Sequence, residues 1–234
     1  GSWKSISGDA RGTEPEEPAV SRSIVCKSCG VGAGAASASR RFNACGDDPL
    51  RISLDEWGLG PPWAVSRFGA AHAMYAAGLL GASLRASHAV LAATNYFEPI
   101  NEGAIRVGPW SAALSPVGQA MTLYAKHANM RRLLVPDALG ELDVVATTSD
   151  GELLVTIAHL NASGWREANL TVRIEAEGKA PPPAFARVTT LRARGFNSSA
   201  TFAVEAAGPL PVAHGEIRVI VPPFSVVQMA LSGK

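Results

Sequence analysis

The sequence predicts an α/β part followed by an all-β part in a chain of 234 residues. Between residues 49 and 135, two apolar runs alternate with two segments of helical periodicity, which is typical of parallel strands joined by crossover helices. From residue 136 to 234, short Val- and Thr-rich runs alternate with turn signals, which is typical of an antiparallel β-sandwich. Residues 1–48 include the run Gly30–Ser39, almost only Gly, Ala, Ser and Val, so we expect an irregular, low-complexity N-terminal segment.

The composition argues against two classes of partner. Hydrophobic residues make up 47% of the chain, which is enough for a core, whereas charged residues make up 18% and the formal net charge is +1. No charged segment would attract nucleic acid or an anionic membrane surface. The longest apolar stretch, Met74–Leu84, is interrupted by Gly78 and Gly81 and is shorter than the roughly 18 residues of a membrane span. We therefore expect neither nucleic acid nor a membrane as a partner.

The cysteines and histidines do not indicate a metal or a cofactor. Cys26, Cys29 and Cys45 are too few for a disulfide framework. Cys26-x-x-Cys29 could belong to a redox or zinc site, but zinc needs about four ligands and no second Cys or His pair lies nearby. The five histidines contain no pair at ligand spacing, so we expect no metal site.

Three N-glycosylation sequons occur in the all-β part, beginning at Asn161, Asn169 and Asn197. They are compatible with secretion, although the short pattern arises easily by chance. The first residues show no basic region followed by an apolar one, so no signal peptide is visible in this chain.

The α/β part begins with an apolar run at residues 50–56, which predicts a buried strand. The run ends in Asp55, Glu56 and Trp57, and a loop with Pro61 and Pro62 follows. Apolar residues then recur at helical spacing from Trp63 to about Ala86, which predicts a helix packed closely against a sheet through its many small residues.

A second apolar run, His88–Phe97, predicts another buried strand, and residues 98–114 are expected to form a loop. Ser115 and Pro116 resemble a helix N-cap followed by proline at the first helical position. The helix is expected to continue to about Asn129.

Seven strands are expected in the all-β part, near residues 142–148, 153–158, 170–174, 188–191, 200–204, 217–221 and 226–231. Turn signals separate them, among them Asp150-Gly151, Gly208-Pro209 and Pro222-Pro223.

The Asp-Glu-Trp sequence at the end of the first strand is the strongest candidate site. An apolar strand that ends in a carboxylate is how a parallel α/β barrel presents a catalytic acid at its C-terminal mouth. The alternative is a strand-end carboxylate in an ordinary salt bridge. Trp57 and Trp63, and more weakly Trp110, could border a sugar subsite or could pack within loops.

Four motifs, in this order, resemble the C-terminal part of a clan A glycoside hydrolase, most closely the family 51 α-L-arabinofuranosidases. In that family an apolar strand ends in Asp-Glu-Trp, a helix follows the pattern T-P-x7-Y-x2-H, one strand follows D-G-x-L-x-V-x3-N, and the domain closes with P-x2-S-V. The corresponding segments are Leu54–Trp57, Ser115–His127, Asp150–Asn161 and Pro222–Val227. The resemblance covers roughly residues 50–232, and another clan A family is a weaker possibility.

The resemblance implies the last two β/α units of a (β/α)8 barrel, followed by a β-sandwich. It implies that Glu56 is the nucleophile of a retaining hydrolase and that the partner is an arabinoside or a related polysaccharide. Asn95 corresponds to a family asparagine on the eighth strand, although the glutamine that precedes it in the family is replaced. Trp57, Trp63 and Asn95 are therefore expected to bind substrate.

The second carboxyl group of the reaction is missing from the matching segment. The family's acid/base Glu lies upstream in an Asn-Glu pair, whereas the only such pair here, Asn101-Glu102, lies downstream. Retaining hydrolysis needs two carboxyl groups about 5–5.5 Å apart. Asp55 should point away from Glu56 on a strand, while Glu98 or Glu102 could approach from the loop.

Two hypotheses of function follow. The chain is either the nucleophile-bearing fragment of an arabinofuranosidase-like hydrolase or a non-catalytic, truncated remnant whose β-sandwich is structural or binds carbohydrate. In both cases we expect the isolated chain to be inactive on aryl glycosides.

Overall fold

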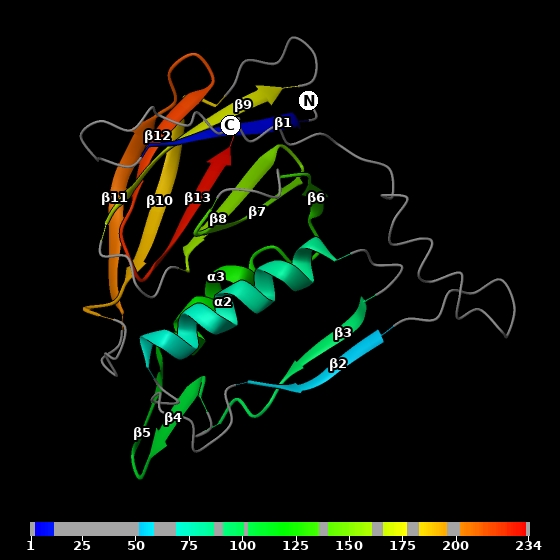
Figure 1. The fold of residues 1–234 in the computed structure, drawn as a ribbon, viewed down its shortest axis with the longest axis vertical. Coiled ribbons are helices and arrows are strands. Elements are labelled where there is room, and N and C mark those ends of the chain that lie inside the picture. Colours follow the sequence, from blue (N-terminus) through cyan, green and yellow to red (C-terminus); the bar gives the residue numbers. More distant parts are fainter. Residues whose placement is uncertain are drawn as a thin grey trace, which may run out of the picture.

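The computed structural model describes residues 3–11, 52–58, 69–86, 91–100, 103–135, 140–160, 166–176, 183–195 and 202–232. These residues are mostly β-strand and include two helices, α2 (Ala70–Arg85) and α3 (Pro116–Ala125). The helices lie between a large antiparallel sheet and a small parallel pair of strands (Figure 1). Neither helix is long and apolar enough to cross a membrane.

Two antiparallel sheets form the all-β part. The larger has the strand order β11-β10-β13-β8-β7-β6, and the smaller has the order β1-β9-β12. The bounds of the larger sheet are β6 Arg131–Leu133, β7 Leu142–Ser149, β8 Glu152–His159, β10 Phe185–Arg192, β11 Ala203–Pro211 and β13 Ser225–Ser232. Those of the smaller are β1 Trp3–Arg11, β9 Ala168–Ala176 and β12 Glu216–Val221. Six of the seven strands expected from the sequence lie within one of these strands, whereas the strand expected at residues 200–204 overlaps β11 only at Ala203 and Val204.

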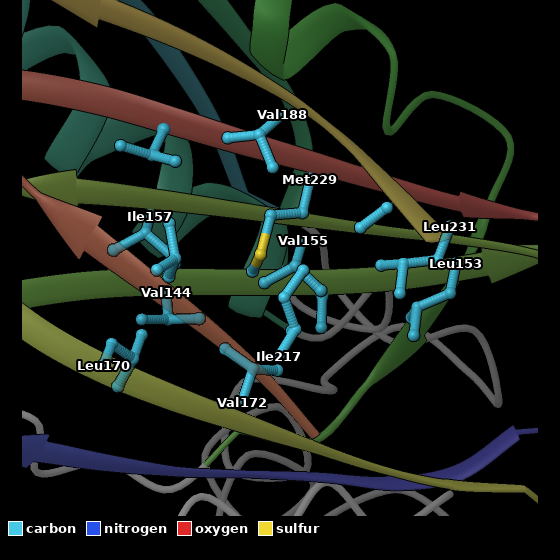
Figure 2. Packing of buried hydrophobic residues seen from close by; sticks show 14 of the residues in the cluster. Val144, Leu153, Val155, Ile157, Leu170, Val172, Val188, Ile217, Met229 and Leu231 are labelled. Carbon is cyan, nitrogen blue, oxygen red and sulfur yellow. The ribbon is translucent and has the colours of Figure 1, made fainter. Parts of the chain in front are cut away.

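The two sheets share one apolar core. Alternate residues of β9 point into it (Leu170, Val172 and Ile174), while Arg173 on the same strand is exposed. They meet side chains of β7, β8 and β13 such as Val155 and Met229, both of which are fully buried (Figure 2). Period-2 alternation therefore orients the smaller sheet, as the sequence predicted.

The central strands β7, β8 and β13 of the larger sheet are buried on both faces because α2 and α3 cover the face opposite the smaller sheet, whereas the edge strand β11 is exposed. Seven consecutive residues of β7, from Leu142 to Thr148, are buried for this reason. The contact face of α2 is built from alanines, which lets the helix approach the sheet closely. At Gly81 an added Cβ would overlap the carboxylate of Asp143 on β7.

Local signals place several element ends correctly. Ser115 caps α3 by accepting a hydrogen bond from the Gly118 amide at 3.3 Å, and Pro116 is the first helical residue. The helix ends at Ala125, four residues earlier than expected, and residues 126–129 form turns. Asp150 and Gly151, both with positive φ, make the two-residue turn between β7 and β8.

The parallel pair differs from its prediction in burial. Strands β2 (Ile52–Trp57) and β3 (Leu91–Tyr96) are parallel, as expected, but the predicted burial is wrong for both, since β3 has no buried residue and β2 has only Trp57. Ile52 is 59% exposed and Leu54 is 37% exposed. Among the described residues no third strand flanks the pair, and parallel strands are normally covered on both faces.

Other differences lie where neighbouring strands override local signals. The expected loop 98–114 contains a hairpin of β4 (Ile105–Gly108) and β5 (Ser111–Leu114). Strand β1 lies in the N-terminal segment that was expected to be irregular, because the open edge of β9 accepts an extended backbone. Gly208-Pro209 is not a turn but a bulge within the edge strand β11, where proline needs no ladder hydrogen bond. The described part of the helix expected from Trp63 begins at Ala70.

Candidate functional site

Glu56 lies in a strained bulge at the C-terminal end of β2. Leu54 pairs with Thr94 and Trp57 pairs with Tyr96, so two residues of β2 face one residue of β3. Glu56 itself has φ 57°, in the left-handed region that non-glycine residues rarely adopt. Bulges re-aim side chains near active sites, and residues held at positive φ cluster there. The carboxylate is exposed, and it has no hydrogen bond or ion pair to another described residue.

Asp55, the other acid of the motif, is held by its neighbours on the parallel pair. Its Oδ1 accepts a hydrogen bond from Ser53 Oγ at 2.9 Å and another from the side-chain amide of Asn95. Asn95, expected to contact substrate, thus has its amide directed at Asp55. Both side chains are exposed at the strand ends. The two acids therefore have different surroundings: Oδ1 of Asp55 accepts two hydrogen bonds, whereas the Glu56 carboxylate accepts none from the described residues.

Trp57 packs inside the chain. It is 5% exposed, and the Tyr96 ring meets it edge-on with centroids 4.9 Å apart and planes at 76°. The ring face of Trp57 is therefore occupied by the chain, which is the loop-packing alternative that the sequence left open. Its Nε1–H is buried and has no hydrogen-bond partner among the described residues. A buried donor of this kind indicates a place where a further acceptor would fit.

Tyr96 and His72 support Trp57 from the helix side. His72 is fully buried on α2, and its Nε2 lies 3.3 Å from the Tyr96 hydroxyl. Two glycines let the chain close around this pair. An added Cβ at Gly58 would lie 2.8 Å from the Phe97 carbonyl oxygen, and one at Gly103 would overlap the Tyr96 hydroxyl. The pairing of His72 with Tyr96 was not predictable from the sequence, because the two residues lie 24 positions apart on different elements.

The remaining predicted site residues do not join this cluster. Trp63 and Glu102 lie outside the described residues, as do Cys26, Cys29 and Cys45. Glu98 is exposed after β3, and Trp110 is 98% exposed at the turn of the β4–β5 hairpin. Within the described ranges, no group of three His, Cys, Asp or Glu side chains is placed to hold a metal ion.

A partly buried ion pair fixes the C-terminal end of α2 to β7. Arg85 Nη2 lies 2.5 Å from Asp143 Oδ2, and the Arg85 guanidinium also donates to the Val144 carbonyl at 3.3 Å. The nearby Tyr124 of α3 is 4% exposed. Burial and repulsion by Asp143 raise the pKa of the Tyr124 hydroxyl, against a smaller opposing effect of Arg85. The phenol therefore stays neutral between the helices and the sheet.

A neutral histidine joins α3 to the same sheet. His127 is 2% exposed, and its two ring nitrogens lie 2.7 Å from the hydroxyls of Thr147 and Thr156. Burial lowers the pKa of His127 to about 4. Burial also lowers the pKa of His159, against the opposing effects of Glu141 and of a backbone hydrogen bond. His127 was the last residue of a sequence motif, but its partners were not predictable from it.

Solved structures of similar fold are glycoside hydrolases. A family 51 α-L-arabinofuranosidase from Thermotoga petrophila RKU-1 matches with a TM-score of 0.61 and 18% identity, over 78% of this chain and 43% of that one. A family 51 arabinofuranosidase from Xanthomonas axonopodis pv. citri matches with a TM-score of 0.59 and 19% identity, over 78% and 41%. A family 30 endoxylanase from Clostridium papyrosolvens C71 matches with a TM-score of 0.54 and 11% identity, over 77% and 41%.

These likenesses agree with the family resemblance found in the sequence, and at these identities they concern the fold. The chain spans less than half of the length of each of these proteins. No protein-family model matches the sequence. No curated protein sequence matches it either.

Proposed function

We propose that the chain is the nucleophile-bearing part of a retaining glycoside hydrolase of the α-L-arabinofuranosidase type, acting on arabinose-containing polysaccharides. In this proposal β2, α2, β3 and α3 are the last two units of a (β/α)8 barrel, and the two antiparallel sheets are the β-sandwich that follows it. The observation that carries the proposal is the bulge at the end of β2, which holds Glu56 at φ 57° with an open carboxylate. The likeness to family 51 structures supports it.

The chemistry assigned to Glu56 is attack on the anomeric carbon of the substrate, which forms a glycosyl-enzyme intermediate and releases the leaving group. An acid must protonate the leaving oxygen and later activate water from about 5–5.5 Å away. Asp55 is unsuited to this role, since it already accepts hydrogen bonds from Ser53 and Asn95. The acid/base is therefore assigned to a part of the enzyme that this chain does not contain.

The neighbouring residues receive roles from their contacts. The side-chain amide of Asn95 donates a hydrogen bond to Asp55 beside Glu56, so Asn95 is assigned to orient the Asp55 carboxylate. With substrate bound, the same amide is assigned to contact a sugar hydroxyl. Trp57, which was expected to bind substrate, is packed on Tyr96 and is 5% exposed, so it is assigned to support the end of β2 next to Glu56. Trp63, which lies outside the described residues, keeps its proposed role at a sugar subsite.

The alternative is a non-catalytic remnant whose all-β part is structural or binds carbohydrate. It is favoured by the exposure of Ile52 and Leu54 on β2, because an intact barrel would cover them. The two proposals differ in whether Glu56 can act as a nucleophile when the rest of a (β/α)8 barrel is supplied.

A chimera tests the difference. Residues 52–234 would replace the superposed C-terminal part of the Thermotoga petrophila arabinofuranosidase, and the purified chimera would be checked for a cooperative thermal melt. We expect hydrolysis of an aryl α-L-arabinofuranoside by the chimera and none by the isolated chain. Glu56→Gln should lower kcat/KM of the chimera at least about 10³-fold, because the covalent nucleophile is lost.

Asp55→Asn is the matched control, since it neutralises the adjacent acid and should leave far more activity. A folded chimera whose rate is the same with Gln at position 56 would refute the nucleophile assignment. A folded chimera with no activity at all would favour the non-catalytic alternative. Turnover by the isolated chain, lost with Glu56→Gln, would show that the acid/base is present in this chain after all.

A further inference from the structure

The β4–β5 hairpin presents a fully exposed indole. Its strands pair from Ile105 opposite Leu114 to Gly108 opposite Ser111, which leaves Pro109 and Trp110 as the two-residue turn. Trp110 is 98% exposed, the highest value among the large hydrophobic side chains of the described residues. Tryptophan is on average a highly buried residue, so a side chain without contacts to its own chain is a strong candidate for contact with something else.

The base of the hairpin is fixed to the segment after β3 and to the buried start of α3. The Ile105 amide donates to the Pro99 carbonyl at 2.7 Å, and the Ser115 amide donates to the Ala104 carbonyl at 2.9 Å. Ser115 Oγ also donates to the Gly103 carbonyl. The first turn of α3 packs so closely on this base that a Cβ at Gly118 would overlap the Ala104 carbonyl oxygen. The base of the short hairpin is therefore fixed, and the turn that carries Trp110 is only four residues from it.

The hairpin is at the same end of the parallel pair as Glu56. The hairpin follows β3, and its base at Gly103 lies against the Tyr96 hydroxyl and the His72 ring. The Phe97 amide, just after β3, donates to the Trp57 carbonyl at 3.0 Å. Figure 1 shows the hairpin projecting from the end of the molecule at which the arrowheads of β2 and β3 lie.

The chemistry of the hairpin surface suits a neutral ligand. Val107 is 48% exposed and Leu114 is 41% exposed, and Arg106, half-buried, is the only charged residue from 105 to 114. An uncharged, flat aromatic face beside aliphatic side chains matches the C–H face of a sugar ring, which needs no counter-charge. A protein partner recognised through ion pairs would find little to pair with on this surface.

We propose that Trp110 is a stacking platform for a sugar ring of a neutral polysaccharide chain, outside the position next to Glu56. The platform rests on the proposed function, because it assigns to the indole a unit of the same arabinose-containing polymer. The platform and the nucleophile lie on different elements, the β4–β5 turn and the end of β2, and have different roles. The first holds the chain and the second attacks one linkage of it.

Affinity electrophoresis of the 234-residue chain tests the platform. Native gels would contain soluble arabinoxylan, arabinan or no polysaccharide, with circular dichroism as a check of folding for each variant. We expect both polymers to retard the wild-type chain, and Trp110→Ala to raise the apparent Kd about tenfold, which corresponds to the loss of one stacking contact. Trp110→Phe should keep most of the retardation, because a ring remains.

Val204→Ala is the matched control, since it removes a side chain that is 60% exposed and apolar from the edge strand β11, outside the hairpin. The proposal would be overturned if neither polymer retarded the wild-type chain. It would also be overturned if wild type and Trp110→Ala were retarded equally. A concentration-dependent dimer that Trp110→Ala dissociates without changing retardation would overturn it too, because the indole would then contact a second copy of the chain. Glu56→Gln should be retarded as strongly as wild type. The nucleophile assignment is tested by hydrolysis in the chimera and the platform by gel retardation, so the failure of one is distinguishable from the failure of the other.

Discussion

Protonation of His127 should destabilise the fold as the pH falls, and the hydrogen bonds around the ring explain why. Thr147 Oγ1 donates to Met130 Sδ at 3.3 Å, so it accepts from His127 Nδ1–H. Thr156 Oγ1 accepts from the Gln228 amide at 2.9 Å, so its own hydrogen is directed to His127 Nε2. All donors and acceptors are matched when the ring is neutral and protonated on Nδ1. A second ring proton would meet the Thr156 hydroxyl hydrogen in a buried site.

The magnitude follows from the two pKa values. The pKa of His127 is about 4 in the folded chain, against an ordinary value of 6.5 in the unfolded chain. Between these values the unfolded state binds a proton that the folded state does not, so stability decreases as the pH falls. The full contribution is present above pH 6.5 and is lost progressively towards pH 4. Each pH unit in this window corresponds to about 1.4 kcal/mol, so the loss at pH 4.5 is roughly 2.5 kcal/mol.

Urea unfolding at pH 7.5 and pH 4.5 measures this effect. His127→Gln should lower the free energy of unfolding at pH 7.5 by about 1–3 kcal/mol, because buried hydrogen bonds are lost. Its further decrease between the two pH values should be smaller than that of wild type by roughly 2.5 kcal/mol. Contributions of His159 and the carboxylates are common to both proteins and cancel in the comparison.

His214→Asn is the matched control. This exposed histidine has φ 53°, a conformation that asparagine tolerates, so the substitution should leave the wild-type pH dependence unchanged. If wild type and His127→Gln lose equal stability between pH 7.5 and 4.5, His127 is not a buried neutral histidine and the reasoning fails.

Two further pairs of variants test packing with the same unfolding assay. Arg85→Ala should cost about 2–3 kcal/mol, because it leaves the buried Asp143 carboxylate without its cation, whereas Arg173→Ala, which breaks the exposed pair with Glu216, should cost less than about 1 kcal/mol. Equal losses would contradict the burial argument. Gly103→Ala should cost about 1–3 kcal/mol, because the added methyl group overlaps the Tyr96 hydroxyl, whereas Gly208→Ala, with no atom within 4 Å of its Cβ, should change stability by less than about 0.5 kcal/mol. If Gly103→Ala left the free energy of unfolding unchanged, the loop at Gly103 would not pack against the Tyr96 hydroxyl.

Elements defined by local signals were predictable, and elements defined by distant partners were not. Ser115 and Pro116 determine the start of α3 through one side-chain hydrogen bond and one fixed φ, both within a single turn. Asp150-Gly151 is recognisable because both residues accept positive φ. Pro109-Trp110 carries no such signal, since proline has a fixed negative φ, so the β4–β5 hairpin was missed. The apolar residues Ile52 and Leu54 predicted a buried strand, but both side chains are exposed. Burial depends on neighbouring elements, which the sequence of the strand itself does not specify.

The candidate site follows the same rule. The position of Glu56 at a strand end was predictable from the Leu54–Trp57 motif. The bulge was not, because it arises from the register of β2 against β3, whose facing residues are 40 apart in the chain. Asn95 was predicted as a sugar contact from its place in the family pattern, while its hydrogen bond to Asp55 becomes visible only when the two strands pair.

The strained backbone at Glu56 needs support, because a non-glycine residue at positive φ costs about 1–3 kcal/mol. A series of side-chain contacts connects Glu56 to the larger sheet. Trp57, next to Glu56, packs on Tyr96, and the Tyr96 hydroxyl meets His72 on α2.

Helix α2 is in turn held on β7 by Arg85 and Asp143, and β7 is buried on both of its faces. A mutation at Asp143 should therefore disturb the end of β2 without touching it. The all-β part therefore helps to hold the backbone of the candidate nucleophile in its strained conformation. The rest of a catalytic site would have to pack on the exposed face of β2.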